Sequence, residues 1–510
     1  MERHDEAYPI WRDSGLRRKV LMHVDAHHDM YGKWVEAKHR LVSIANFIYP
    51  ALEDGIVREV IWVVPDETWA TKRGLKDVLR ALKRIDPGSA ARRVKLQPDG
   101  RRITGIVLDK PLTVCPVAHL PAIDEDVLLD IDVDYFVTPN IGYRGIDSYG
   151  EIPWCWPADL VAQLRARCVQ SELVTIAYSV EGGYTPLQWK YLGDELALRL
   201  QRRSGSEVAL RGMAFMHMAA LAAQRGEYSA AEEAYGAASQ LLPASAAPYY
   251  HLAHLSLAVG RPGDGRKSYQ KALSLDASYR TAYNSAGFWN YWYDRPQAAA
   301  QAHRHTLDLD PEDAYAHLGL GLLAIERKRW QEADAHIRRA LALNDQSVDA
   351  YRALGRVLCA QGSYDEAIVA YERSLKLVLA GHHRLADDAF VTFLSGDRQP
   401  LDSGHGQIHA ELARLSARKG ATQPAIAGYR MAIAMGEDGV LVRSRLAYLY
   451  LRLGQWRRCA GETWQAIRKI PKALDKGRRR LLYRLRYRSR LVWRNLRSLR
   501  KPQAGASMWS

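Results

Sequence analysis

The chain has 510 residues, of which 47% are hydrophobic and 25% charged, and its formal net charge is +15. This composition excludes wholesale disorder, and the length predicts about three domains that each bury a core of their own. No apolar run approaches the roughly 18 residues that a membrane-spanning helix needs, and residues 1–10 lack the apolar stretch of a secretory signal. Five scattered cysteines without CxxC spacing favour a reduced, cytoplasmic compartment.

Apolar, β-branched runs alternate with amphipathic stretches over the first 205 residues. The runs predict buried strands at 20–24, 60–64, 127–133 and 173–178, and the stretches predict helices at 33–48, 75–85, 157–169 and 186–200. This alternation predicts an α/β domain over residues 1–205 with a mainly parallel sheet. Such sheets bind their ligands at the carboxyl ends of the strands, so the chemistry is expected there.

Carboxylates and histidines gather where two of these predicted strands end. Residues 23–29 read His-Val-Asp-Ala-His-His-Asp, and residues 130–134 read Asp-Ile-Asp-Val-Asp. Buried carboxylates repel one another and lose solvation, so such a group requires a cation. Period-two alternation, if extension continues, places alternate side chains on one side. Their oxygen-rich donor set suits Mn²⁺ best, with Zn²⁺ or Mg²⁺ as alternatives for one or two ions. The predicted metal ligands are Asp25, His27, Asp29, Asp132 and Asp134.

The alternation of side chains along the chain also suggests roles for residues near the predicted metal ligands. His28 alternates away from His27 and is expected to be structural, whereas His23 remains open between a ligand and a residue that supports the ligands. The turn at 179–185 contains two glycines, which permit close approach of the backbone to a ligand. We expect Glu181 and Tyr184 of this turn to contact a substrate.

These motifs resemble those of the arginase/deacetylase superfamily. Asp25-Ala-His27-His-Asp29 resembles its DAHxD motif, and Asp132-Val-Asp134 is similar to its second, DxD-type motif. Glu181-Gly-Gly-Tyr184 resembles the Gly-rich segment beside the metal. Together with segments 61–65 and 129–136, the pattern over residues 18–195 is most similar to the peptide arginases, which convert arginine within ribosomally made peptides to ornithine and urea.

The resemblance implies a metal-dependent attack of water on the guanidinium carbon. Asp29 or Asp134 would hold the proton, Glu181 would orient the guanidinium, and the proton donor to the leaving amine remains open between His28 and His39. Arginases also supply a histidine ligand from a motif upstream of DAHxD. No such motif precedes Asp25, and His23 or Asp130 could take its place.

Two other functions remain open for this region. A deacetylase or related amidohydrolase would use Tyr184 to stabilise an oxyanion. A non-enzymatic scaffold would use only the repeats that follow, with the α/β domain as a remnant.

A 34-residue period follows the α/β region. Small residues recur at Gly287, Gly321 and Gly355, and a second series of small residues is followed four positions later by bulky ones, as in Ala367 and Tyr371. Glycines at 226, 260 and 362 share one phase, where the turn between two helices requires a positive φ. The pattern resembles tetratricopeptide repeats. It predicts five repeats over 206–381, a loop at 382–405 and two more repeats over 406–473.

Repeat arrays of this kind bind extended peptides or partner helices. The array is therefore expected to hold a peptide or protein substrate or a partner. The alternative is that the repeats only rigidify or dimerise the protein.

The positive charge is concentrated after the repeats, in residues 474–510. Residues 476–510 contain two Lys and ten Arg and no acidic residue, whereas the preceding 475 residues hold 60 basic and 57 acidic ones. In this segment leucines recur at helical spacing, on one face, with arginines between them. This pattern predicts a basic amphipathic helix over 476–501. Such a helix suits an anionic membrane surface or an acidic partner, with nucleic acid a weaker candidate, or it simply caps the array. We therefore expect a cytoplasmic protein that can be peripheral to a membrane.

Overall fold

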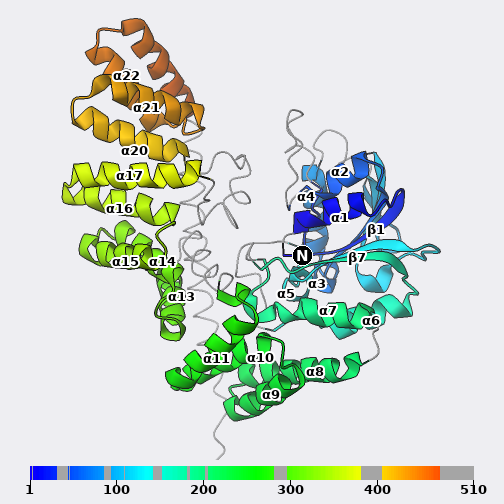
Figure 1. Ribbon diagram of the computed structural model, residues 1–510. Helices are drawn as coiled ribbons and strands as arrows, with labels where there is room; N and C mark the ends of the chain where they lie inside the picture. Colours follow the sequence, from blue (N-terminus) through cyan, green and yellow to red (C-terminus); the bar gives the residue numbers. More distant parts are fainter. Residues whose placement is uncertain are drawn as a thin grey trace, which may run out of the picture. The chain divides into compact units, whose positions relative to one another are not determined.

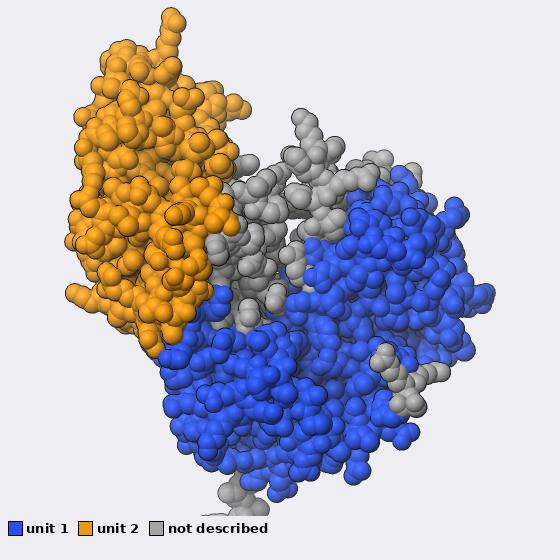
Figure 2. All heavy atoms as spheres, viewed as in Figure 1, with its two compact units in different colours: residues 1–323, 386–398 blue, residues 324–385, 399–510 orange. Residues whose placement is uncertain are grey.

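The computed structural model describes residues 1–2, 4–30, 44, 46–85, 94–107, 109–141, 152–180, 184–201, 205–280, 296–380 and 405–470. These residues form two compact units, shown in Figure 2, with the boundary after Leu323. The first unit contains an α/β domain and the first repeats. The second contains the remaining repeats. The predicted loop at 382–405 and the basic tail fall almost wholly outside the described residues, and His39 and Glu181 do so as well.

A seven-stranded sheet with the order β3-β4-β5-β2-β1-β6-β7 forms the centre of the α/β domain. Neighbouring strands among β5, β2, β1, β6 and β7 are parallel, and β3 and β4 add an antiparallel edge. The strands are β1 (Lys19–Val24), β2 (Val57–Val63), β3 (Lys95–Leu96), β4 (Ile103–Val107), β5 (Lys110–Cys115), β6 (Val127–Asp132) and β7 (Ser171–Ala177). The predicted α/β fold with a mainly parallel sheet is confirmed. All four predicted strands are present, and β3, β4 and β5 are additions.

Helices cover both faces of the sheet (Figure 1). One face packs against α1 (Ala7–Asp13), α2 (Ile48–Glu53) and α4 (Lys72–Ile85). The amphipathic spacing of α4 explains its orientation, because Val78, Leu82 and Ile85 are buried one turn apart. The other face packs against α6 (Pro157–Ala166) and α7 (Tyr191–Gln201). Burial on both faces explains why the central strands are almost continuously apolar.

The interior of the first unit continues from the sheet into the repeats. One hydrophobic cluster joins residues of β1 and β6 to residues of the first four repeat helices. At the junction, Trp156 stacks on His217 with ring centroids 3.9 Å apart, and His217 Nε2 lies 2.7 Å from Glu195 Oε2. Lys190 Nζ donates to Asp276 Oδ2 at 2.7 Å. The α/β domain and these repeats therefore share one core. The domain boundaries given above remain predictions.

The repeat helices come in pairs separated by tight turns. In the first unit they are α8 (Ser206–Gln224), α9 (Tyr228–Leu241), α10 (Ala247–Ala258), α11 (Pro262–Leu275) and α13 (Pro296–Leu309), followed by α14 (Ala314–Glu326) at the boundary. In the second they are α15 (Trp330–Leu343), α16 (Val348–Gln361), α17 (Tyr364–Leu379), α20 (His405–Arg418), α21 (Thr422–Ala434) and α22 (Val440–Arg452).

The predicted turn glycines have the required backbone conformation. Gly226, Gly260 and Gly362 have φ of 78°, 78° and 87°. Small residues also allow close helix packing as expected, since a Cβ on Gly355 would lie 2.8 Å from the ring of Tyr371. The helical repeat array is thus confirmed. No helix among the described residues is long and apolar enough to span a bilayer.

Candidate metal centre

The carboxyl ends of β1 and β6 bring the two acidic segments together. These strands are parallel neighbours, and in their register His23 pairs with Asp130 and Val24 with Ile131. β1 lies between β2 and β6, in the interior of the sheet. The residues that follow β1 and end β6 therefore lie at the edge where parallel sheets bind ligands.

Eight ionisable side chains meet at this edge. The ligand atoms of His4, Asp25 and Asp132 lie within 4.8 Å of one another, and so do those of Asp25, His27 and Asp134. Two further triads of the same kind share these residues or their neighbours. The four triads, called here the His/Asp cluster, contain His4, His23, Asp25, His27, Asp29, Asp130, Asp132 and Asp134. All five residues predicted to bind metal belong to it.

Turns, rather than a continued strand, direct these side chains inward. β1 ends at Val24 and β6 at Asp132, so period-two alternation does not extend through the motifs. Instead, Asp25 Oδ1 accepts a hydrogen bond from the His27 backbone N at 2.6 Å. Asp29 has φ of 46°, in the left-handed region that non-glycine residues rarely adopt. Backbone strain of this kind persists where the surroundings hold it and is common at functional sites.

The second motif makes a similar turn. Asp132 Oδ1 accepts from the backbone N of Asp134 at 2.9 Å, and Asp134 begins the short helix α5 (Asp134–Val137). The other oxygen of Asp132, Oδ2, accepts from the hydroxyl of Ser179 at 2.6 Å. Ser179 also has a left-handed φ, of 53°. Each aspartate thus shapes its own turn while another oxygen faces the cluster.

His4 was not predicted, yet it lies at the centre of the cluster. Its Nδ1 is 2.9 Å from Asp132 Oδ2 and 3.3 Å from Asp25 Oδ2. The chain before it pairs with the segment after β7, because the backbone N atoms of Tyr178 and Ser179 donate to the carbonyls of Met1 and Glu2. This long-range pairing leaves no local spacing in the sequence, so motif analysis could not find it.

Asp130 holds two of the histidines in place. Its Oδ2 lies 2.8 Å from both His4 Nε2 and His23 Nδ1. Its Oδ1 accepts from Thr175 Oγ1 at 2.6 Å, and Trp11 Nε1 donates to the same hydroxyl at 3.2 Å. A carboxylate that contacts one imidazole nitrogen fixes the orientation of the ring and leaves the other nitrogen for a ligand. Asp130 and His23 therefore suit a supporting position behind the predicted ligands.

Burial and mutual charge interactions shift the pKa values of the residues in the cluster. Burial raises the pKa of Asp29 to about 6, and the charge of Asp25 adds to this effect. Burial and repulsion from Asp132 and Asp25 raise the pKa of Asp134 well above its usual value. Burial disfavours a charged His4, but the aspartates around it outweigh burial and raise its pKa well above the usual value. Protons and a cation would therefore compete for the same groups.

The donor set fits a divalent cation. Neither carboxylate oxygen of Asp134 receives a well-directed hydrogen bond from a described residue, although His27 Nδ1 lies 2.8 Å from Oδ2. Asp25 Oδ2 is also buried and receives no well-directed hydrogen bond from a described residue. Buried polar atoms are normally satisfied, so oxygens left over inside a group of carboxylates indicate room for a bound ion. Oxygen ligands with imidazole match Mn²⁺ or Zn²⁺.

Around the cluster, Tyr184 and His28 take different positions. The Tyr184 ring packs edge-on against His27 with centroids 5.3 Å apart, and its side chain is buried. His28 stands outside the triads. Its Nδ1 accepts from the backbone N of Met30 at 3.1 Å, and its ring packs against Trp62. The contact expected between Glu181 and a substrate lies outside the described residues.

Comparisons with known proteins identify only the repeats. The tetratricopeptide repeat family matches residues 348–378, which lie on α16 and α17. No curated protein matches the chain. The C-terminal half thus carries tetratricopeptide repeats, which typically mediate contacts between proteins.

Several solved repeat proteins are similar to part of the chain. The MamA protein is 23% identical, with 32% of this chain and 91% of that chain covered and a TM-score of 0.19. A tetratricopeptide repeat protein from Parabacteroides merdae is 18% identical, with 51% and 93% covered and a TM-score of 0.27. A thermophilic repeat protein from Thermus thermophilus is 20% identical, with 42% and 99% covered and a TM-score of 0.29. Similarity at this level carries no implication for activity or partners.

Proposed function

We propose that the α/β domain is a metal-dependent hydrolase similar to the arginases, and that it converts peptidyl arginine to ornithine and urea. The observation that carries this proposal is the His/Asp cluster, in which five aspartates and three histidines meet at the carboxyl ends of β1 and β6. Its members include every aspartate and the histidine of the DAHxD-like and DxD-like motifs. A purely structural role would not explain why so many ionisable groups share one buried site, where each charge loses its solvation.

The ligands divide into two neighbouring sets that share Asp25. One set is His4, Asp25 and Asp132, and the other is Asp25, His27 and Asp134. The two sets would hold one divalent cation or two, and Asp25 belongs to both sets. His4 supplies the upstream histidine that the arginase resemblance requires. A divalent cation bound there would supply Lewis-acid activation of water for hydrolysis.

Residues of the cluster can accept the proton that this water releases. Asp134 Oδ2 lies 2.8 Å from His27 Nδ1, so the pair can hold a proton at either atom. The raised pKa of Asp134, caused by burial and then by Asp132 and Asp25, makes its carboxylate a stronger base than an exposed one. Hydrolysis then breaks one C–N bond of the guanidinium, with the proton passing to the departing ornithine amine.

Substrate charge fits the same site. A guanidinium is a planar cation that pairs with carboxylates, and the cluster is rich in them. We retain Glu181 as the residue proposed to orient the guanidinium. The repeats are proposed to hold the peptide or a partner protein. A deacetylase is the second candidate, supported by the Tyr184 ring beside His27, because a tyrosine in that place could stabilise an oxyanion.

The two candidates release different products. The full chain, supplied with Mn²⁺, is incubated with one peptide containing arginine and another containing acetyl-lysine, and urea, acetate and the peptide masses are measured. We expect urea and the mass change from arginine to ornithine, with no acetate. Asp132→Asn should reduce the rate more than about a hundredfold, since residues that merely support metal ligands already contribute 10–100-fold.

The matched control is Asp124→Asn, which removes the same charge from an exposed residue ahead of β6. It should turn over peptide at the rate of the unaltered chain. Acetate in place of urea would favour the deacetylase. Turnover that survives Asp132→Asn would remove the cluster from the chemistry altogether.

A further inference from the structure

Four arginines line a cavity of about 210 Å³ in the second unit, far along the chain from the His/Asp cluster. The cavity lies between α20 and α22, with α21 contributing one residue. Its lining, called here the arginine pocket, consists of Arg414, Ala417, Arg418, Tyr429, Arg445, Tyr448, Leu449 and Arg452. Acidic residues are missing from this lining.

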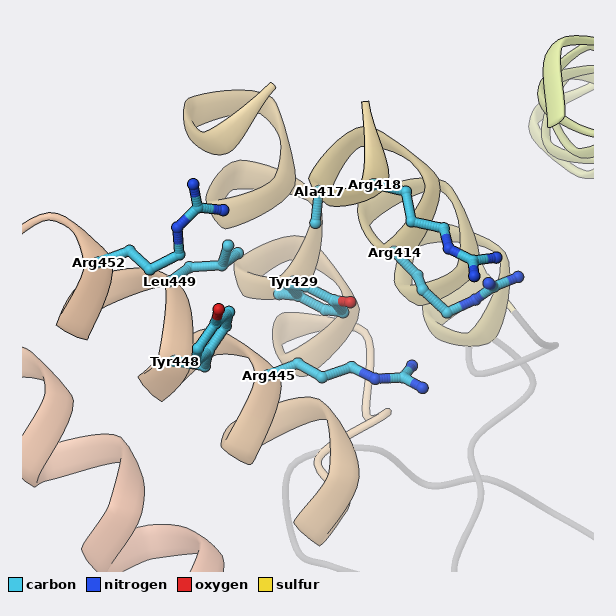
Figure 3. A pocket seen from close by; sticks show the side chains of 8 residues that line it. All are labelled: Arg414, Ala417, Arg418, Tyr429, Arg445, Tyr448, Leu449 and Arg452. Atoms are coloured by element: carbon cyan, nitrogen blue, oxygen red, sulfur yellow. The ribbon is translucent and has the colours of Figure 1, made fainter. Parts of the chain in front are cut away.

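The pocket combines an apolar floor with charged walls (Figure 3). Tyr429 and Leu449 are buried and form its base, whereas Tyr448 is 59% exposed. Figure 3 shows the guanidinium groups of Arg414 and Arg445 extending toward the same side as the Tyr429 hydroxyl. Arg452 lies on the other side of the tyrosine pair. Positive charge therefore flanks an apolar centre.

Most of this charge is not neutralised by the residues that the structure describes. Arg414 Nε donates to Glu411 Oε2 at 2.7 Å, so one of the four is paired. Arg418 donates to the Tyr364 hydroxyl at 2.7 Å and packs over its ring. Among the described residues, no carboxylate forms an ion pair with Arg418, Arg445 or Arg452. Three guanidinium groups around one small cavity repel one another, and an anionic ligand would relieve this repulsion.

We propose that the arginine pocket binds an acidic peptide segment in which an apolar side chain is flanked by carboxylates. The apolar residue would fill the cavity above Tyr429 and Leu449, and the carboxylates would pair with the arginines on either side. Guanidinium groups match carboxylates through two parallel hydrogen bonds, which gives the pairing direction as well as strength.

The size of the cavity favours a peptide side chain over a free small molecule. Pockets for small-molecule ligands usually measure about 300–1,000 Å³, which exceeds the volume here. The apolar floor argues against inorganic phosphate, which has nothing to bury against tyrosine and leucine. This surface belongs to the repeats alone, so it does not depend on the chemistry proposed for the α/β domain.

Fluorescence anisotropy with a labelled peptide tests the proposal on the full chain. The probe is Glu-Glu-Leu-Glu-Glu, and two companion peptides replace either the glutamates by glutamines or the leucine by glycine. The pocket variant carries Arg418→Gln and Arg445→Gln. The matched control carries Arg430→Gln and Arg457→Gln, which remove the same charge from exposed positions of the same repeats outside the pocket.

We expect the pocket variant to bind the acidic peptide about tenfold or more weakly, since it loses two guanidinium groups that form charge-assisted hydrogen bonds with the carboxylates. The control should bind it as the unaltered chain does, and both companion peptides should bind weakly. Equal losses in the pocket and control variants would reduce the interaction to general attraction by the positive chain. Equal binding of the glycine peptide, or displacement of the probe by inorganic phosphate at comparable concentration, would overturn the assignment to an acidic peptide with an apolar centre.

Discussion

At the scale of single residues, Asp134 lies in surroundings that disfavour its charged form. Burial and the charges of Asp132 and Asp25 raise its pKa well above the usual value, so its surroundings disfavour the ionised form in the metal-free protein. A group whose folded pKa is raised in this way costs stability as the pH rises. Asp134→Asn removes that cost but also removes an oxygen that we propose binds the cation.

We therefore predict that Asp134→Asn stabilises the metal-free protein by on the order of 1–3 kcal/mol. The same change should reduce the additional stability that Mn²⁺ confers. Thermal unfolding with a chelator and with Mn²⁺ measures both effects, and Asp124→Asn serves as the control that shifts neither. A variant that is less stable in chelator and still stabilised fully by Mn²⁺ would show that Asp134 is structural.

The candidate site could be predicted only in part from single residues. Asp25, His27, Asp29, Asp132 and Asp134 stand in two short motifs at the ends of apolar runs, and those runs determine where the side chains meet. His4 reaches the same place through backbone pairing with residues more than 170 positions away. A contact of that range leaves no periodicity, so only the folded chain reveals it.

At the scale of elements, the small residues that recur every 34 positions mark sites where an added methyl group would clash with the neighbouring helix. A Cβ at Gly355 in α16 would approach the ring of Tyr371 in α17 to 2.8 Å, and that ring is fully buried. Alanine in place of a helical glycine normally adds up to about 1 kcal/mol of helix propensity. Overpacking costs about 1–3 kcal/mol, so the clash should outweigh that gain.

Gly355→Ala should consequently lower the free energy of unfolding by about 1–2 kcal/mol, measured by urea denaturation. Gly236→Ala in α9 is the matched control, because no atom lies within 4 Å of a Cβ built there. It should leave stability unchanged or raise it. If Gly355→Ala raised the free energy of unfolding instead, Tyr371 would have to move aside. Close helix packing would then not explain why small residues recur every 34 positions.

Elements with a strong period were predictable and those without one were not. The long apolar strands and the 34-residue helix pairs follow from burial on one or two faces. β4 and β5 escaped prediction because they are short, and polar residues interrupt their apolar pattern. The turns after β1 and β6 escaped it too, since hydrogen bonds from their own aspartates replace extended alternation.

At the scale of the whole molecule, the shared core of the first unit predicts that the α/β domain does not stand alone. Trp189, Tyr191 and Leu192 are buried in the cluster that also contains α8–α11 residues. A fragment of residues 1–205 would expose these side chains to water, whereas a fragment of residues 1–323 keeps them covered.

We predict that fragment 1–205 aggregates or lacks a cooperative thermal transition, and that fragment 1–323 is soluble and unfolds cooperatively. Light scattering and circular dichroism distinguish them. A soluble 1–205 fragment with the same midpoint as 1–323 would show that the repeats contribute little to the fold of the α/β domain. It would also make deletion of the repeats a direct test of the proposal that they bind the substrate.

The central claim is that the His/Asp cluster binds a divalent cation, and calorimetric titration of Mn²⁺ into the metal-free full chain tests it most directly. Asp29, with its pKa raised to about 6 by burial and by Asp25, must lose its proton to act as a ligand. We predict saturable binding at about pH 7.5 that is about tenfold or more weaker at about pH 5, and that is lost in Asp132→Asn. Binding of equal affinity at both pH values and in Asp132→Asn would contradict the account.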